Sequence, residues 1–513
     1  MNKTTISLAV CTALFLGGCA PSATSLNQNA GKIGGTAIGA GIGAAIGKQF
    51  GGRNGALLGA AVGGLLGYMV GDGIDKRRAE LAKIAQEEKI EIYSYDIVAT
   101  DMIIDDNVSD SALSNNDKKG QNSNVVGDVF TIISDENQFD IGSSKLNANA
   151  AVAYNKFAQQ YAASNRKILI IGHTDDSGDS SFNQKLSEDR AKYVSEIFAG
   201  SGIKQENIYY LGAGETQPIA DNNTNDGASK NRRVEIIELN DEAEIIKYAS
   251  SRVANPKFFR EVAPTYVVKA PKKEKIVAEV QKDSSQTIDN TFTQTKQPIP
   301  TKTKVVFDKN TKNYIDFKGE PIINNEFTLV SKFGEPVHNN SSKGLFTTKA
   351  VASSDFSNAY VSCVYDKPRF GGETKSLATG EKVSYSTKDF KKGLNETSWT
   401  SNIDDHLIGF TPVGVLKDGA KVTQNPDVYV YKNYDPINPK NADVKLKTHV
   451  NTYQGTQGMI YRVFVDDDSS QIKCVDIVFD EKNTNQQSVG KLYYANNNDM
   501  YQREFQIKQL QKN

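Results

Sequence analysis

The sequence predicts a multidomain α+β protein, with a helical hairpin near the N-terminus, an α/β sandwich in the middle and a mainly β domain at the C-terminus. Three observations support this fold class. Glycine recurs at every fourth residue from Gly31 to Gly71 in an apolar segment, strand and helix patterns alternate over 127–240, and short β-type runs punctuated by Gly, Asn, Asp and Pro recur over 305–513. A chain of 513 residues is also long enough for about two or three domains.

The charge balance narrows the classes of partner. The chain carries 60 Lys and Arg against 61 Asp and Glu, which gives a formal net charge of -1. A nucleic-acid-binding surface depends on an excess of basic side chains. We therefore expect no nucleic-acid partner.

Residues 1–18 are typical of a signal peptide for export. A cationic start is followed by an apolar stretch over 6–16, which is shorter than the roughly 20 residues that cross a bilayer. The sequence Leu16-Gly17-Gly18-Cys19 resembles a bacterial lipobox, and this resemblance implies cleavage before Cys19 and acylation of that residue. Because Ala20 rather than Asp follows, it also favours the outer membrane. Ordinary cleavage, with an incidental Cys19, is the alternative.

The glycine-rich segment 31–73 follows a short tether at 19–30. A spacing of four places the glycines on one face of a helix, where small residues allow close helix packing in lipid. A turn at 51–55 predicts a hairpin with arms at 32–50 and 56–70. The segment resembles the glycine zipper of YiaD-type lipoproteins, which implies contact with membrane lipid. Partial insertion, packing into a homo-oligomer and a merely flexible tether all stay open.

Residues 74–126 predict a connection rather than a domain. A polar helix extends to about residue 88, and a strand-like run covers 92–104. The segment 105–125 is rich in Asp, Asn and Ser, which is typical of a long polar loop or spacer.

The segment 127–240 predicts a sheet with helices on one face. Strands are expected at 129–133, 167–172, 209–212 and 234–239, and helices up to 163 and over 183–199. On the second helix, Arg190 lies within the apolar stripe, at the same angle as Asn183. Because a buried arginine needs a partner, Asp175 is the natural candidate.

Several separated sequence blocks in this segment resemble one family. Residues 174–194 match the pattern TDxxGxxxxNxxLSxxRAxxV of OmpA-like domains, and the blocks 212–218 and 231–236 match later parts of that pattern. The resemblance covers 127–239. It implies noncovalent binding of peptidoglycan through the diaminopimelate of the stem peptide.

Diaminopimelate ends in an ammonium and a carboxylate on one carbon. Asp175 can accept from the ammonium, and Arg190 can present its planar guanidinium to the carboxylate. The full set of candidate binding residues is Asp175, Arg190, Asn183, Thr174, Leu186, Phe139 and Arg232. The alternative is that Asp175 and Arg190 only form a bridge that stabilises the fold. We expect His173 to be structural and Asp176 to be solvated.

The C-terminal half resembles no family that we can identify. Residues 241–304 are rich in proline and charge and predict a linker. Strands are expected at 326–330, 359–365, 428–431, 459–465 and 472–479, in a sandwich or barrel-like domain over 305–513. Cys363 and Cys474 are expected to form a disulfide in an oxidising periplasm, with two buried thiols as the alternative.

Together these patterns predict a binding protein rather than an enzyme, without a metal or cofactor. We expect an outer-membrane lipoprotein, mostly periplasmic, that binds peptidoglycan, tethers the membrane to the wall and presents its C-terminal domain to an unidentified protein partner. Two alternatives stay open. In the first, the C-terminal domain is an enzyme acting on glycans, which needs paired carboxylates. In the second, the chain is a subunit of an oligomeric envelope or secretion assembly.

Overall fold

The computed structural model describes a large part of the chain, in two compact units. The described residues are 73–98, 125–133, 138–139, 142–254, 256–260, 262, 307–308, 311, 314–323, 327–334, 361–383, 389–438, 440–480, 487–497 and 499–510. The first unit comprises Met1–Ile92 and Asp110–Gln121, and the second comprises Tyr93–Ser109 and Asn122–Asn513. The expected signal peptide, Cys19, tether and glycine-zipper hairpin lie outside the described residues.

In the first unit, the structure describes helix α2 (Gly73–Glu88). Its end agrees with the predicted polar helix, and Lys89 follows with a φ of 57°, in the left-handed region that often ends a helix. Leu81, Ile84 and Ala85 are buried at helical spacing. No helix in the described ranges combines the length and the apolar character that a membrane crossing requires.

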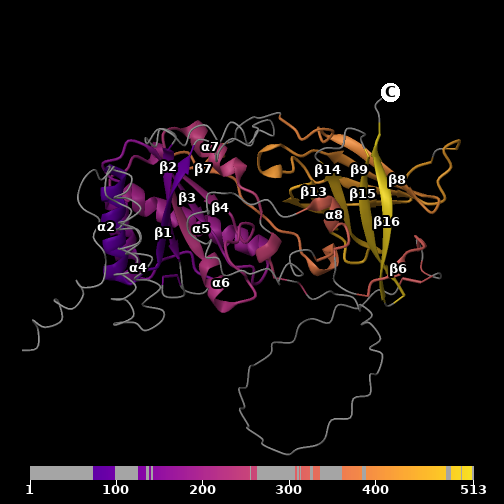
Figure 1. Ribbon diagram of the computed structural model, residues 1–513, viewed down its shortest axis with the longest axis horizontal. Coiled ribbons are helices and arrows are strands. Elements are labelled where there is room, and N and C mark those ends of the chain that lie inside the picture. Colours follow the sequence, from indigo (N-terminus) through magenta and orange to yellow (C-terminus); the bar gives the residue numbers. More distant parts are fainter. Residues whose placement is uncertain are drawn as a thin grey trace, which may run out of the picture. The chain divides into compact units, whose positions relative to one another are not determined.

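The second unit contains two sheets (Figure 1). The first has the order β1-β2-β5-β3-β4-β7. Its strands are β1 (Ile92–Val98), β2 (Val125–Ile133), β3 (Lys167–Gly172), β4 (Ile208–Gly212), β5 (Arg233–Leu239) and β7 (Lys375–Ser376). Strands β3 and β4 are parallel, whereas β5 pairs antiparallel with both β2 and β3. The four strands predicted within 127–240 are confirmed.

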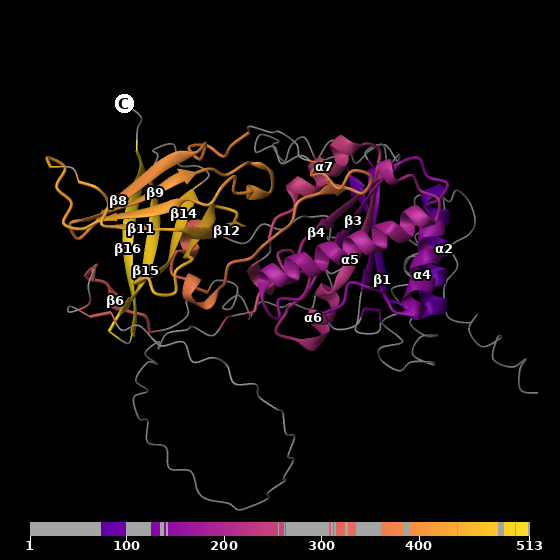
Figure 2. The ribbon, with the colours of Figure 1, turned by 180° about the vertical axis from the view of Figure 1, so that it is seen from behind.

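One face of this sheet is covered by α4 (Ala148–Gln159) and α5 (Ser180–Gly200), and Figure 2 shows α5 lying across the strands. Glycine permits the close approach of α5, because a Cβ atom on Gly172 would lie 2.2 Å from the backbone oxygen of Ser187. The sheet therefore holds α5 directly over the end of β3.

The opposite face is covered by α7 (Glu242–Ser251), which lies beyond the segment 127–240 for which helices on one face were predicted. Ile245 and Tyr248 of α7 share a buried cluster with Leu169 and Ile171 of β3. These two strand residues point away from the face that carries α5, because side chains alternate along a strand. The expected linker at 241–304 therefore begins with a helix that completes the core.

Strand β7 comes from the C-terminal half of the chain. It pairs antiparallel with β4, with Ser376 opposite Tyr209 and Lys375 opposite Tyr210. The backbone nitrogen of Gly372 also donates to the oxygen of Gly212 over 2.9 Å. The sheet built mainly by 127–240 thus includes a strand from far outside that segment.

The second sheet has ten strands in a nearly closed, barrel-like arrangement. Its order is β11-β10-β9-β8-β16-β15-β14-β13-β12, with β6 paired to β16. Its strands are β6 (Glu320–Pro321), β8 (Thr397–Ile403), β9 (His406–Val413), β10 (Asp427–Tyr431), β11 (Val444–Leu446), β12 (Thr448–Gln454), β13 (Gly458–Val465), β14 (Ile472–Asp480), β15 (Gln487–Asn496) and β16 (Asp499–Gln509). Aromatic and branched side chains, among them Trp399 and Phe410, fill its core.

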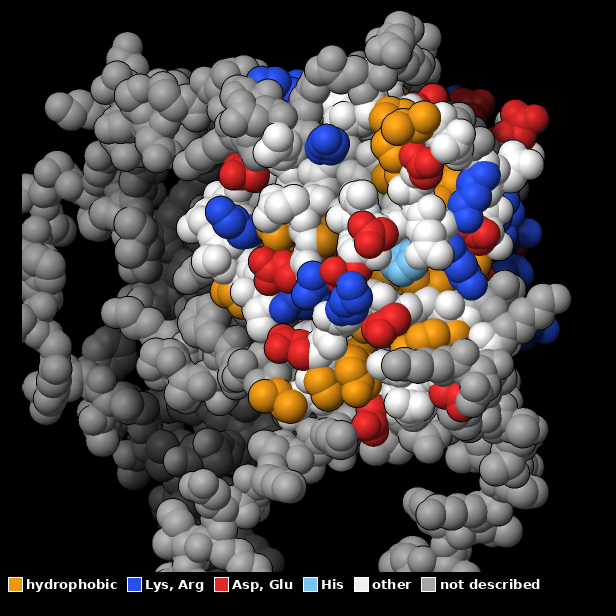
Figure 3. All heavy atoms as spheres, turned by 90° about the vertical axis from the view of Figure 1, so that its right-hand side faces the viewer, with side chains coloured by type: hydrophobic (Ala, Val, Ile, Leu, Met, Phe, Trp, Pro, Cys, Tyr) orange, Lys and Arg blue, Asp and Glu red, His pale blue; other side chains and the backbone are white. Residues whose placement is uncertain are grey.

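The outer face of this barrel mixes charges of both signs. Figure 3 shows acidic and basic side chains next to one another, with apolar side chains in separate small groups between them. As far as the described residues show, this face therefore presents neither a single-sign charged field nor one broad apolar patch.

Three of the predicted C-terminal strands are confirmed as β10, β13 and β14, and two are wrong. Residues 327–329 lead into the short helix α8 (Val330–Phe333), and Cys363–Tyr365 forms a 3-10 helix. In the first case Phe327, Leu329 and Phe333 are buried in one cluster, so their alternation reflects packing of a turn rather than a strand.

Of the predicted linker, residues 256–260 pack against the barrel domain, and most of the remainder lies outside the described residues. Phe259 is buried in the cluster of Phe333 and Tyr453, and its ring centroid lies 5.9 Å from that of Tyr453. On the neighbouring segment, a disulfide joins Cys363 to Cys474 of β14. Each of the two sheets of the second unit is therefore completed by a segment from the other side of the chain. Phe259, which follows α7, packs in the barrel, and β7, from the C-terminal half, pairs in the first sheet.

Candidate functional site

The candidate site lies where β3 and β4 end and α5 begins. Asp179 caps α5, because its side chain accepts from the backbone nitrogen of Phe182 over 2.9 Å. Between the strand and this cap, the loop 173–178 turns at Gly178, whose φ is +81°. The loop therefore presents Thr174 and Asp175 beside the first turns of α5.

Asp175 is held as a carboxylate by neighbours on two sides. Arg232 donates to it from Nη1 over 2.6 Å, and Ser177 donates from both its backbone nitrogen and its hydroxyl. Burial opposes ionisation, but the hydrogen bonds from Ser177 and Arg232 outweigh it and lower the pKa of Asp175. Asp175 is therefore negatively charged at neutral pH.

Arg190 is buried on α5, as its position in the apolar stripe predicted. Its Nε donates to the oxygen of Ser143 over 2.9 Å, and its guanidinium lies 4.7 Å from the ring centroid of Phe139. Burial lowers the pKa of Arg190 to about 10, so it stays charged at neutral pH. Its two terminal nitrogens make no hydrogen bond to any residue that the structure describes.

The expected pairing of Arg190 with Asp175 is wrong. Asp175 pairs with Arg232 instead, while the backbone of Ser143 and the Phe139 ring stabilise Arg190. The reason is local: Arg232 directly follows α6 (Asn225–Asn231) and reaches the carboxylate from the next loop. The interpretation of Asp175 and Arg190 as a simple fold-stabilising bridge does not fit this geometry.

The remaining candidates have distinct surroundings. Asn183 donates from its amide to the oxygen of Ser177 and to Glu215, each over 2.8 Å, so it ties α5 to the loop. The hydroxyl of Thr174 is buried and has no hydrogen-bond partner within the described ranges. Leu186 is half-buried on α5, one turn before Arg190.

His173 lies in a buried charged cluster, which fits the structural role expected for it. Its Nε2 lies 3.3 Å from Glu235, which also pairs with Arg233 and Arg252. Burial and the nearby arginines lower the pKa of His173 to about 3, so the imidazole is neutral at physiological pH.

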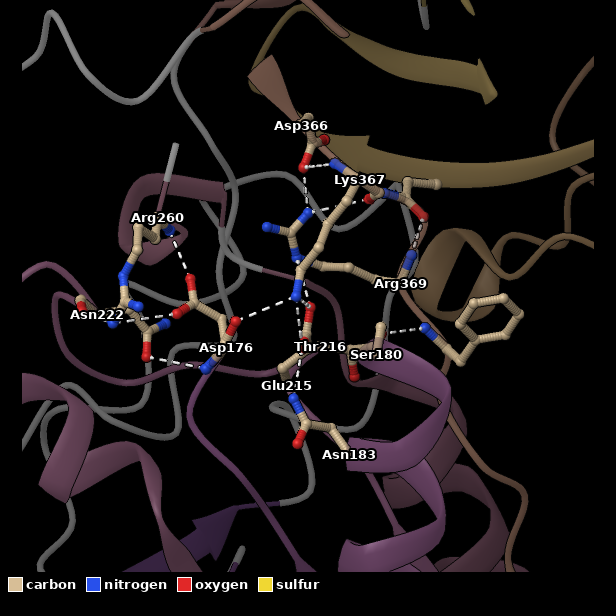
Figure 4. Close-up of polar contacts among 12 residues, drawn as sticks. Asp176, Ser180, Asn183, Glu215, Thr216, Asn222, Arg260, Asp366, Lys367 and Arg369 are labelled. Atoms are coloured by element: carbon tan, nitrogen blue, oxygen red, sulfur yellow. Dashed lines mark hydrogen bonds and ion pairs between the residues drawn. The ribbon is translucent and has the colours of Figure 1, made fainter. Parts of the chain in front are cut away.

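Sequence reasoning missed the contacts that support the loop from the C-terminal half (Figure 4). Asp176 was expected to be solvated, but it is buried and accepts from the backbone nitrogen of Arg260 over 2.6 Å. Lys367 and Arg369 approach the buried Glu215 at 3.0 and 3.6 Å. Glu215 stands in a block that matched the family pattern, whereas no local signal marks two basic residues so distant in sequence.

Comparisons with known proteins find a similarity that includes the residues of the site. A model of the OmpA family matches residues 138–232, and a model of the YMGG-like Gly-zipper matches residues 1–75. Both predicted resemblances are thereby confirmed for these segments. Neither model extends into the C-terminal barrel.

The relatives are similar over the same central region. Outer-membrane lipoprotein YfiB of Pseudomonas aeruginosa is 43% identical over 94 residues, which are 18% of this chain and 56% of that protein. Peptidoglycan-binding protein ArfA of Mycobacterium tuberculosis is 34% identical over 96 residues, 19% and 29% of the two chains. The solved cell wall anchor of the T6SS from Pseudomonas aeruginosa is 25% identical, covering 23% of this chain and 84% of that one, with a TM-score of 0.21. This chain thus spans about half of YfiB and less of ArfA.

Proposed function

Because residues 138–232 match the OmpA family, we propose that this protein binds peptidoglycan noncovalently and ties the outer membrane to the cell wall. The observation that carries the proposal is that one site holds both an ionised carboxylate, Asp175, which Arg232 already pairs, and a charged guanidinium, Arg190, whose terminal nitrogens have no partner among the described residues. Relatives named as an outer-membrane lipoprotein and a peptidoglycan-binding protein support it.

The ligand that suits this pair is the free end of diaminopimelate. The planar fork of Arg190 matches its carboxylate, and the buried hydroxyl of Thr174 can add a donor beside it. The Asp175 carboxylate receives the ammonium, and Arg232 and Ser177 keep it ionised and oriented. Asn183 holds the loop through its amide, while Phe139 and Leu186 form apolar walls.

The segments on either side of the peptidoglycan site connect it to the outer membrane and add a second binding surface. In this proposal acylated Cys19 and the glycine zipper anchor the protein in the outer membrane, and the C-terminal barrel is presented in the periplasm to a protein partner. The Gly-zipper match over 1–75 and the outer-membrane relatives support the envelope location.

The test is co-sedimentation of the full-length protein, in detergent, with purified peptidoglycan. The parent should sediment with walls that contain diaminopimelate and much less with walls that carry lysine at that position. Asp175→Asn and Arg190→Met should each weaken binding by about tenfold or more, as expected for loss of a charge-assisted contact. A matched control is Arg166→Met, since Arg166 pairs with Glu238 at the other end of β3, outside the site.

The control variant should bind like the parent. Circular dichroism and a melting curve establish that each variant is folded. Equal sedimentation of the parent with both kinds of wall, or full binding by folded Arg190→Met, would refute the proposed site.

A further inference from the structure

A short arm of the C-terminal half, residues 366–372, supports the loop that carries Asp175. Lys367 donates from Nζ to the backbone oxygens of Asp176 and Gly178, over 3.1 and 2.9 Å. These two carbonyls lie one and three residues after Asp175. In Figure 4 the Lys367 side chain reaches down from the arm towards the loop and Glu215.

The same lysine neutralises a buried charge beneath the site. Glu215 is 1% exposed, and its carboxylate lies 3.0 Å from Lys367 while it accepts from Asn183. Burial raises the pKa of Glu215, and Lys367 and Arg369 oppose this shift. Because Asn183 also bonds the oxygen of Ser177, the chain of contacts from Lys367 returns to the loop through α5.

The arm is fixed to the barrel as well as to the segment 127–240. Asp366 accepts from Arg462 of β13 over 2.7 Å and from the hydroxyl of Tyr453 over 2.8 Å. Asn451 of β12 accepts from the backbone nitrogen of Arg369 and donates to the oxygen of Lys367. The position of Lys367 is therefore set by the strands of the C-terminal sheet.

We propose that Lys367 is a positioning residue for the peptidoglycan site, through which the C-terminal barrel fixes the loop 175–178 in its binding conformation. The inference rests on the proposed function and deepens it. Lys367 does not touch the ligand; it holds two carbonyls of the loop and balances Glu215, so that Asp175 is oriented before binding. If a protein that binds the barrel displaces this arm, it lowers the affinity of the site for peptidoglycan. By thermodynamic linkage, bound peptidoglycan then lowers the affinity of the barrel for that protein by the same factor.

The chain offers a closely matched control. Lys375 also reaches from the C-terminal half to an acidic residue of α5, since its Nζ lies 2.8 Å from Glu188. The exposed fractions of the two lysine side chains are similar, 20% for Lys367 and 24% for Lys375. Lys375 does not contact the loop. Its substitution therefore measures how much the affinity changes when any ion pair between α5 and the C-terminal half is lost.

The experiment is titration calorimetry of a soluble, diaminopimelate-containing muropeptide into the full-length protein. We compare the parent, Lys367→Met, Lys367→Arg and Lys375→Met, with a melting curve for each. Lys367→Met should raise Kd by about tenfold, Lys367→Arg should recover most of the affinity, and Lys375→Met should match the parent. If Lys367→Met does not fold, Lys367→Gln, which keeps a shorter donor, takes its place.

The outcomes separate the two proposals. A parent that does not bind the muropeptide overturns the proposed function and this inference with it. A parent that binds, with an unchanged Kd in folded Lys367→Met, overturns the inference alone. Equal weakening by Lys367→Met and Lys375→Met also overturns it, because the effect would then follow from any loss of contact between the halves.

Discussion

Replacing Phe259 by Ala tests whether the chain after α7 belongs to the barrel. The ring is 8% exposed, packs with Phe327, Phe333 and Tyr453, and lies under the Arg369 guanidinium at 3.7 Å from its centroid. Truncation of a buried phenylalanine costs about 3–5 kcal/mol, and loss of a cation–π contact about 1 kcal/mol more. Together these two losses give an expected decrease of about 4–6 kcal/mol in the free energy of unfolding.

Urea unfolding of the full-length protein in detergent measures this change. The midpoint should fall while the slope stays constant, since the surface exposed on unfolding hardly changes. Ile437→Ala is the control, because Ile437 is 84% exposed and should cost less than about 0.5 kcal/mol. If Phe259→Ala proves as mild as this control, the segment is a free linker and the packing described for it is wrong.

Two further predictions concern stability. The disulfide closes a loop of 111 residues, so the double variant Cys363→Ser, Cys474→Ser should lose about 2–5 kcal/mol in urea unfolding, and a reducing agent should lower the parent to the same midpoint. The folded pKa of His173 is about 3 against 6.5 in the unfolded chain, so the unfolded state binds the extra proton between these values and stability falls as pH decreases through 6.5. Between pH 7.5 and about pH 5.5, protonation of His173 in the unfolded chain should lower the free energy of unfolding by about 1.4 kcal/mol, and urea unfolding of His173→Gln should show a loss smaller by this amount. Burial also lowers the pKa values of His406 and His449, so these two residues act in the same direction.

The segment 138–232, which matches the OmpA family, was predictable because its signals are local. The loop residues Thr174 and Asp175 and the helix residues Asn183 and Arg190 lie within one strand–loop–helix unit, where spacing fixes direction. The angular position of Arg190 in the apolar stripe correctly predicted its burial. Its partner could not be predicted, because Arg232 approaches from a different loop and competes for the same carboxylate.

The exchange of segments between the halves left little trace in the sequence. Strand β7 is held by backbone hydrogen bonds to β4, which need no side-chain pattern. Phe259 stands in a proline-rich stretch whose composition is that of a linker. Lys367 lies 152 residues from Glu215, so only the folded chain brings the two charges together.

The late arrival of β7 has a consequence for biogenesis. The chain emerges from its N-terminus, so β4 emerges well before Lys375 follows it. During that interval the edge of β4 exposes unpaired backbone donors and acceptors, the kind of edge through which strands aggregate. A chain that ends before residue 375 therefore leaves this edge of β4 unpaired, and β7 is the strand that covers it.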